Sequence, residues 1–335
     1  MSFEIVPVSN FKSSIKEPAD YHYTAFGDQK LWIFSRTFVD QKSFNWGHRV
    51  HYAGGYAVAY DPQTKKFEEP VEVPQLTDLE NGEELLFSHN GLIYLLLTTA
   101  FGGKGEILAL YQWLGNEWKK TGNFADLEEV KKRPVNEDDK GHLYWALVNG
   151  DLDGVKFILS SAGGETITVQ GLDIKVGKVK PFTEISHEVN RLRGRPVGGF
   201  ISGKKLFVSI GVHGCGFRWE SQRFIKVDMT TKVAEELYLE AEYSTLPTFC
   251  FSGPYVKELG KNGDWLTICG STQVGMSDSK FSSEIWVLTG IPDAPVWKKL
   301  EKTAPESTDD FICAYDSATG IVYIVGQDNV AHSVV

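Results

Sequence analysis

One pattern of residues recurs along the chain and constrains the fold more than any other feature. Each copy has a turn containing Gly, Asp or Lys, then a strand-like run of aliphatic and aromatic residues, then a polar stretch. The six runs begin at Leu31, Leu92, Leu143, Leu206, Trp265 and Ile321. Short apolar runs between turn residues predict β-strands, and their spacing of roughly 58 residues predicts a repeat protein.

The residues around each copy repeat as well. A short strand precedes the turn, as in YTAFGD and TFCFSG, and a second hairpin follows, as in GYAVAYDPQTKKFEEP. Each unit is therefore predicted to be four antiparallel strands in a meander, which must stack on its neighbours to bury both faces. Six such units in a ring predict a single all-β domain over residues 1–335, a six-bladed β-propeller. The predicted blades span residues 20–75, 83–124, 134–181, 196–242, 246–302, and 309–335 together with 3–9.

The last blade takes one strand from the other end of the chain. Its own residues supply three strands and leave the fourth position empty, while FEIVPVS at 3–9 is a strand with no partner nearby in the sequence. Pairing FEIVPVS with NVAHSVV at 329–335 would close the ring and cover an apolar edge. Two further segments, 123–132 and 182–196, have helical composition and are expected to be short helices or excursions in the connections between blades.

The units resemble degenerate kelch repeats. AYDPQTKKFEE at 59–69 is similar to the tyrosine–turn–aromatic segment of that family, and Trp118 and Trp297 stand where its fourth-strand tryptophan does. The paired glycines of the family are mostly lost. The resemblance implies a propeller, and kelch-like propellers include interaction modules as well as sugar-acting enzymes and lectins.

Charge and cysteine content limit the classes of binding partner and the cellular compartment that we expect. The formal net charge of −10 argues against nucleic-acid binding, which needs a basic face. No apolar run is long enough to span a membrane, so no membrane partner is expected. The four cysteines form no CxxC pair, which favours a reducing compartment. We expect a cytoplasmic monomer, with the nucleus as another possible location.

Long loops after the second strands carry the candidate binding residues. Aromatic, Arg and Met side chains on such loops are enriched in the centres of protein interfaces. The predicted face consists of Trp46, His48, Arg49, His51, Phe101, Lys104, Arg191, Arg193, Arg195, His213, Arg218, Trp219, Met276, Lys280 and Phe281. The arginines form a basic sector of this face. The sequence therefore predicts a scaffold for a protein or peptide partner.

The sequence supports a metal site or a catalytic site less strongly than a protein-binding face. His48, His51, His213 and Cys215 could ligate a metal only if loops of opposite blades met, so no metal and no cofactor are predicted. No known catalytic motif is present, which favours a non-catalytic protein without deciding the question. The acids at 137–139 and 309–310 precede inner strands and could do acid–base chemistry. The alternative function is accordingly a small-molecule or carbohydrate binder, possibly a sugar-acting enzyme, at the channel mouth.

Overall fold

The structure is a computed structural model in which strands form almost all of the regular elements. It describes residues 2–6, 21–38, 52–74, 76, 82–99, 105–132, 143–162, 166–186, 193–213, 219–237, 257–259, 265–268, 271–274, 278–281, 284–291, 293, 295–303, 311–316, 318–319 and 321–326. The chain divides into two compact units. The amino-terminal unit comprises Phe3–Lys140, Ile312–Asp316 and Val322–Val335, and the central unit comprises Met1–Ser2, Gly141–Phe311 and Ser317–Ile321.

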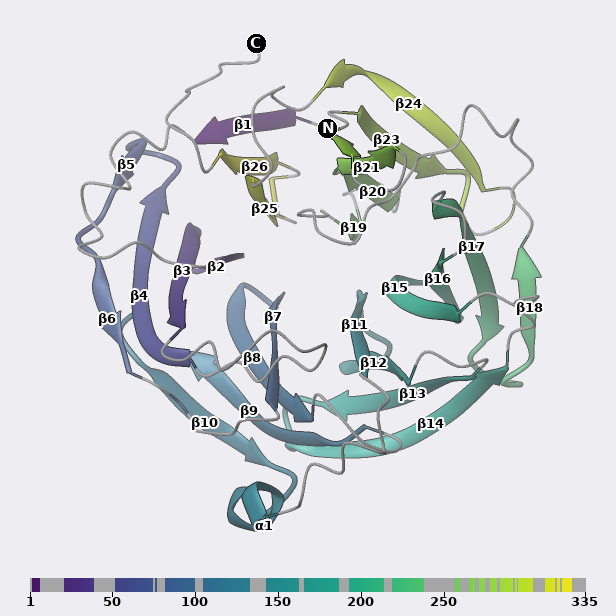
Figure 1. Ribbon diagram of the computed structural model, residues 1–335, viewed down its shortest axis with the longest axis horizontal. Helices are drawn as coiled ribbons and strands as arrows, with labels where there is room; N and C mark the ends of the chain where they lie inside the picture. Colours follow the sequence, from purple (N-terminus) through teal and green to yellow (C-terminus); the bar gives the residue numbers. More distant parts are fainter. Residues whose placement is uncertain are drawn as a thin grey trace. The chain divides into compact units, whose positions relative to one another are not determined.

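The first sheet of the amino-terminal unit is a meander with a tight inner turn. Its strands are β2 (Tyr21–Gly27), β3 (Lys30–Phe38), β4 (Tyr52–Asp61), β5 (Lys66–Phe67) and β6 (Val71–Val73). β2 is the innermost strand in Figure 1, and both β5 and β6 pair with β4. Asp28 and Gln29 connect β2 to β3 with φ of 51° and 60°. Two residues of positive φ make the turn type whose twist matches an antiparallel hairpin.

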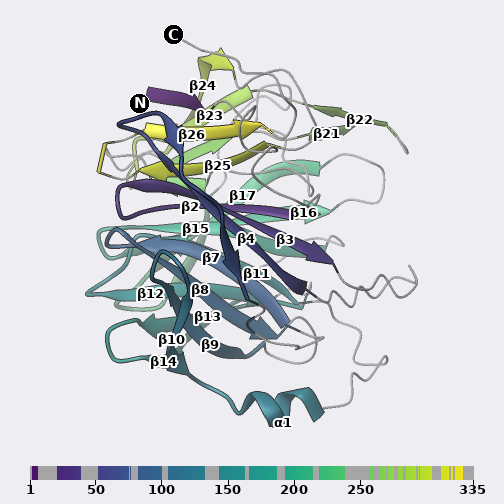
Figure 2. The same ribbon diagram turned by 90° about the vertical axis from the view of Figure 1, so that its left-hand side faces the viewer.

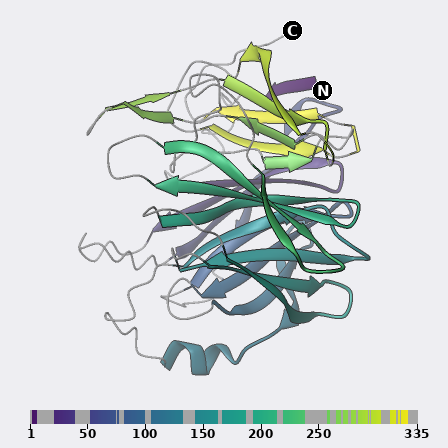
Figure 3. The same cartoon turned by 90° about the vertical axis from the view of Figure 1, so that its right-hand side faces the viewer.

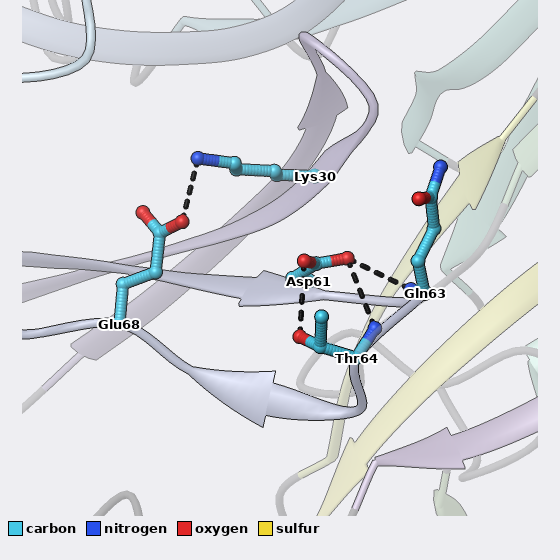
Figure 4. A network of polar contacts seen from close by, with 5 residues as sticks. All are labelled: Lys30, Asp61, Gln63, Thr64 and Glu68. Atoms are coloured by element: carbon cyan, nitrogen blue, oxygen red, sulfur yellow. Dashed lines mark hydrogen bonds and ion pairs between the residues drawn. The ribbon is translucent and has the colours of Figure 1, made fainter.

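The turn between β4 and β5 is held by a carboxylate. The side chain of Asp61 accepts hydrogen bonds from the N–H groups of Gln63 (2.8 Å) and Thr64 (3.3 Å) and from the Thr64 hydroxyl (3.0 Å), as Figure 4 shows. These bonds, the Gln63 N–H foremost, lower the pKa of Asp61. In the same view Lys30 pairs with Glu68 at 2.6 Å, which ties β3 to the segment after β5.

The same outer turn recurs in the central unit. Asp173 accepts a hydrogen bond from the N–H of Val176 at 3.0 Å, and Asp228 accepts from Thr230 and Thr231 at 2.9 Å each. Short acidic side chains that bond their own backbone favour turns at these positions. The same strand–turn–strand motif, with Asp at the start of the turn, recurs in AYDPQTKKF, GLDIKVGKV and KVDMTTKVA. Sheets in both compact units of the chain are therefore built from one repeated motif.

The second sheet of the amino-terminal unit carries the site discussed below. Its strands are β7 (Gly82–His89), β8 (Leu92–Thr99), β9 (Ile107–Trp113) and β10 (Trp118–Asn123), in the order β10-β9-β8-β7. Asn90 and Gly91, with φ of 51° and 75°, make the inner turn between β7 and β8. After β10 the chain forms α1 (Leu127–Lys132), beyond the end of this sheet in Figure 2. This helix confirms a helix within 123–132, over residues 127–132, whereas Asn123 ends β10.

Aromatic side chains fill the core between these two sheets. Trp32 and Phe34 from β3 lie 5.3 Å and 5.2 Å from Trp113 of β9, and Trp113 lies 5.1 Å from Trp118, measured between ring centroids. All four are buried. Trp118, which the kelch resemblance singled out, therefore packs its outer strand onto the neighbouring sheet.

The two ends of the chain meet in a third sheet. Its order is β1-β26-β25, with β1 (Ser2–Val6), β25 (Phe311–Asp316) and β26 (Ile321–Gly326). The pairing of an amino-terminal strand with the last sheet agrees with the sequence prediction. The partner of β1 is β26, however, whereas the predicted partner at 329–335 lies outside the described residues. Phe26 of β2 stacks on Tyr323 of β26 at 5.3 Å, so this sheet packs against the first one.

The central unit contains two meanders joined into one sheet. The order is β14-β13-β12-β11-β15-β16-β17-β18, and Figure 3 shows these teal and green strands edge-on. The bounds are β11 (Tyr144–Asn149), β12 (Val155–Ser161), β13 (Thr166–Asp173), β14 (Lys178–Ser186), β15 (Arg193–Ser202), β16 (Lys205–His213), β17 (Trp219–Asp228) and β18 (Ala234–Leu237). β11 and β15 pair in parallel through Val148–Gly199 and Asn149–Phe200.

A further meander of the central unit has the order β19-β20-β23-β24. Its strands are β19 (Lys257–Leu259), β20 (Trp265–Ile268), β23 (Glu284–Thr289) and β24 (Val296–Thr303), and β21 (Ser271–Val274) with β22 (Asp278–Phe281) forms a hairpin between β20 and β23. Phe200, Phe207, Phe224 and Leu288 form a buried cluster between this sheet and its neighbour, with Trp297 packed against it.

The third predicted unit was misaligned. Its second strand is predicted to begin at Leu143, but β11 from Tyr144 is the inner strand and β12 from Val155 is the second. The true inner turn is Asp153–Gly154, with φ of 54° and 80°. DKGH before Leu143 has the composition of an inner turn, which explains the error. The acidic NGDLDG segment at 149–154 therefore contains this inner turn.

The helical prediction for 182–196 is wrong wherever the structure describes that segment. Residues up to Ser186 belong to β14, and residues from Arg193 belong to β15. β14 pairs with β13 along its length, from Lys178 opposite Asp173 to Ser186 opposite Thr166. Ladder hydrogen bonds with β13 therefore override the local helical composition.

Candidate functional site

Two glutamates stand where the inner strand β7 begins. Glu83 follows Gly82, the first residue of β7, and pairs with Thr98 near the end of β8, while Glu84 pairs with Leu97. Because β7 and β8 are antiparallel, β7 starts and β8 ends at the same side of the sheet. The β8–β9 connection leaves from this side, which we refer to as an edge of the sheet. We call this edge, with Glu83, Thr98 and Thr99, the β7 edge.

Buried hydroxyl groups organise the β7 edge. Thr98 is fully buried, and its hydroxyl donates a hydrogen bond to the backbone carbonyl of Glu83 at 3.2 Å. The Thr99 hydroxyl accepts a bond from the N–H of Glu106 at 3.0 Å, and the Thr99 N–H donates to the Glu106 carbonyl at 3.0 Å. The first bond fixes the backbone at Glu83, and the other two close the β8–β9 connection.

The carboxyl group of Glu83 lies in an apolar setting. Its Oε2 atom is buried and has no hydrogen-bond partner. Alternation along β7 puts Leu85 on the same face, and Leu85 pairs with the fully buried Leu96. Burial raises the pKa of Glu83 from 4.5 to about 7. A carboxyl group with such a pKa is partly protonated near neutral pH and can give up a proton there.

Glu84 has a different role from Glu83. Adjacent residues of a strand point to opposite faces, so the two carboxylates do not converge. Glu84 faces the aromatic core, where burial first and the charge of Glu84 second raise the pKa of Tyr111. Glu83 and Glu84 therefore do not form the pair of carboxylates that a two-acid mechanism requires.

Four of the residues predicted as a binding face come together in the central unit. Arg193 at the start of β15 pairs with His213 at the end of β16, and His213 pairs with Trp219 at the start of β17. Arg195 pairs with Gly211 two positions along the same strands. We call Arg193, Arg195, His213 and Trp219 the β15 edge.

The other predicted residues are not gathered with these four. Lys280 and Phe281 lie on β22, opposite Thr272 and Ser271 of β21. Outside the described residues lie Trp46, His48, Arg49, His51, Phe101, Lys104, Arg191, Arg218 and Met276. The predicted face as a whole stays a prediction. Of the four possible metal ligands only His213 is described, and the described part of the chain has no cluster of three or more ligand side chains.

Sequence reasoning missed Glu83, although a usable signal was present. Acids at the start of inner strands were recognised at 137–139 and 309–310, both of which lie outside the described residues. The same rule applied to NGEELLFSHN would have selected Glu83 and Glu84. Which of the two is buried without a partner depends on tertiary packing, which the sequence pattern does not show.

Comparisons with known proteins bear on the fold class. No family model matches the chain, and no curated protein matches it. Among solved structures it is similar to YjhT, with a TM-score of 0.51 and 12% identity over 84% of this chain and 85% of that one. It is also similar to the fucose-binding lectin of Aleuria aurantia, a six-bladed propeller, with a TM-score of 0.47 and 12% identity over 86% and 80%. A third is the Bacteroides ovatus xyloglucan protein GH43B, with a TM-score of 0.46 and 11% identity over 96% of this chain and 59% of that one.

The meander sheets and these similarities define the class as an all-β propeller. They do not support membership of the kelch family, because no family model matches. The prediction of a non-catalytic protein- or peptide-binding module is not upheld: the solved structures that the chain resembles include a fucose-specific lectin, a putative glycosidase and a putative glycoside hydrolase. The loop composition misled the prediction because aromatic and Arg side chains serve sugar sites as well as protein interfaces. No helix among the described residues is long and apolar enough to cross a membrane.

Proposed function

We propose that the chain is a carbohydrate-binding or sugar-acting protein that uses the β7 edge, with Glu83 as its proton donor. The observation that carries the proposal is the carboxyl group of Glu83, whose Oε2 is buried without a partner and whose pKa is raised to about 7. In the cleavage of a glycosidic bond such an acid would protonate the leaving oxygen, while a second carboxylate would activate water to attack the anomeric carbon. The acids at 137–139 and 309–310 are the sequence's candidates for that second carboxylate.

The residues around Glu83 suit a sugar ligand. The backbone of the β7 edge is fixed by the hydroxyl groups of Thr98 and Thr99, so the position from which the Glu83 side chain extends is defined. Preorganisation of this kind is what a proton donor requires. The β8–β9 connection begins at this edge, and its sequence AFGGKGE supplies an aromatic and a cationic residue.

The finer architecture is also part of the proposal. Five copies of the inner hairpin in the sequence, with a sixth inner turn at Asp153–Gly154, favour six blades of four strands each, with kelch-like repeats as their origin. In such a propeller the inner strands would all begin at the same face, around the mouth of the channel. The ligand would then bind at that mouth, where Glu83 begins its strand.

Hydrolysis of a panel of plant and fungal oligosaccharides tests the proposal. We expect wild type to cleave at least one of them, at a rate that falls as pH rises through about 7, because Glu83 then loses its proton. Glu83→Gln should lower the rate by roughly 10²–10⁴-fold, the usual contribution of a general acid. Glu84→Gln is the matched control, since it makes the same change on the opposite face, and it should keep the wild-type rate.

Two results would contradict parts of this proposal. Sugar binding without cleavage by wild type would refute the role of Glu83 as a proton donor while leaving sugar binding intact. Absence of both binding and cleavage across the panel would refute the carbohydrate assignment itself.

A further inference from the structure

A side-chain hydrogen bond fastens the start of β7 to the neighbouring strand. The Thr98 hydroxyl donates to the backbone carbonyl of Glu83 at 3.2 Å, and the two residues stand directly opposite each other in the β7–β8 ladder. Thr98 is fully buried, so water does not compete for its hydroxyl group. Beyond this pair the ladder continues with Gly82 opposite Thr99. Because Glu83 directly follows the first residue of β7, it lies where strands open most readily.

Uncharged side chains flank Glu83 on its own face of the sheet. Thr98 stands across from it on β8, and Ile107 of β9 pairs with Thr98 on the far side of that strand. On this face of the four described strands the other titratable side chains are His89 of β7, Tyr94 of β8 and Lys119 of β10. All three lie toward the inner and outer turns, at the opposite end of the sheet from Glu83. Burial accordingly raises the pKa of Glu83 to about 7.

The proton affinity of a buried carboxyl group is limited by how firmly its strand is held. The charged form gains free energy when it reaches water, so ionisation of Glu83 favours opening of the strand end around it. If opening were easy, the carboxylate would be hydrated, and the pKa of Glu83 would return toward 4.5. The raised pKa therefore requires that the start of β7 stay paired with β8. The bond from Thr98 contributes to that pairing at Glu83 itself.

We propose that Thr98 is a positioning residue for Glu83: its hydroxyl group keeps the start of β7 closed and so keeps the carboxyl group of Glu83 away from water. Thr98 bonds to the backbone of Glu83, so it acts through the strand and takes no part in proton transfer itself. Thr99 differs, because its hydroxyl accepts from the N–H of Glu106 and closes the β8–β9 connection. The catalytic consequence of Thr98 rests on the proposed function, whereas its effect on the ionisation of Glu83 does not.

Titration of the Glu83 carboxyl group by carbon NMR spectroscopy tests the inference on the full-length protein without any saccharide, and Glu83→Gln assigns the signal. Thr98→Val removes the hydroxyl group and keeps the shape of the side chain. We expect it to lower the titration midpoint of Glu83 by up to about one pH unit, which is about a tenfold loss of proton affinity and the scale of one hydrogen bond. Thr98→Ser keeps the hydroxyl group and should keep the wild-type midpoint.

Thr121→Val is the matched control. The Thr121 hydroxyl of β10 donates to the backbone carbonyl of Leu110 on β9 at 3.3 Å, which is the same kind of bond in the same sheet. Two strands, β9 and β8, separate β10 from β7. This variant should therefore leave the titration midpoint of Glu83 unchanged.

A wild-type midpoint in Thr98→Val overturns the inference. An equal fall in Thr121→Val also overturns it, because the fall would then reflect general loosening of the sheet. If Thr98→Val does not fold, the comparison of Thr98→Ala with Thr98→Ser isolates the hydroxyl group, and equal midpoints in these two variants overturn the inference.

The pH dependence of saccharide cleavage separates this inference from the proposed function. If wild type cleaves a saccharide, the pH–rate profile of Thr98→Val should be displaced to lower pH by the same amount as the titration midpoint. The expected midpoints without cleavage of any saccharide would uphold the role of Thr98 and refute Glu83 as a proton donor to sugars. A wild-type midpoint near 4.5 would refute both.

Discussion

Replacing Glu83 by Gln should make the protein more stable at alkaline pH, because the native state holds a proton that the unfolded state has released. The pKa of Glu83 is about 7 in the folded protein against 4.5 ordinarily, and burial is the cause. Its protonated form is therefore favoured by folding. The stability of the native state is greatest below the ordinary pKa, falls as pH rises through 4.5 to about 7, and levels off above the folded value.

The size of the effect follows from the same two values. One pKa unit corresponds to about 1.4 kcal/mol, so the shift of Glu83 corresponds to a loss of about 3 kcal/mol between acidic and alkaline pH. Glutamine cannot ionise, so the variant lacks this loss. Urea unfolding of wild type, Glu83→Gln and the control Glu84→Gln at about pH 5 and about pH 8 measures it.

The difference between variants is the decisive quantity. Relative to wild type, the free energy of unfolding of Glu83→Gln should increase by up to about 3 kcal/mol between the acidic and the alkaline condition. The free energy of unfolding of Glu84→Gln should change with pH as that of wild type does. A stability of Glu83→Gln that runs parallel to wild type across this range would show that Glu83 ionises normally, and the proton-donor assignment would fail with it.

Three further changes test the packing. Leu96→Ala should lower the free energy of unfolding in urea by about 2–5 kcal/mol, because Leu96 is fully buried. Leu92→Ala on the same strand should lower it little, because Leu92 is 41% exposed, and equal losses would contradict the placement of β8. Gly199→Ala should lower stability by about 1–3 kcal/mol, since an added Cβ would lie 2.7 Å from the Phe207 carbonyl oxygen beside the parallel pair of β11 and β15, and an unchanged unfolding midpoint would refute that close approach. Deleting residues 1–10 should expose the edge of β26 and lower the thermal midpoint or cause self-association, and a monomer with the wild-type midpoint would argue against the β1–β26 pairing.

Local turn chemistry made much of the fold predictable. Asn90–Gly91 between two apolar runs is a strong hairpin signal, and the structure has positive φ at both residues. The outer turns at Asp61, Asp173 and Asp228 likewise follow from short side chains that bond nearby backbone N–H groups. These signals depend on two to five consecutive residues, which a single sequence displays in full.

The sequence-based predictions fail where contacts between distant parts of the chain determine the local structure. Leu143 follows a Gly-containing turn just as Leu92 does, and only the pairing of β11 with both β12 and β15 shows that it precedes an inner strand. The segment from 182 to 186 has helical composition but gains ladder bonds to β13. The pKa of Glu83 depends on side chains packed around it in space. Function was misjudged for a related reason, because loop composition does not distinguish a sugar from a peptide.

A glycan-array screen of Glu83→Gln tests the central claim most directly. This variant keeps the β7 edge but lacks the proton donor, so bound saccharides should persist rather than be cleaved. We predict discrete binding to a small set of saccharides by this variant. A folded Glu83→Gln protein that binds no saccharide on the array, together with a wild type that binds none, would contradict the assignment of this propeller to carbohydrate chemistry.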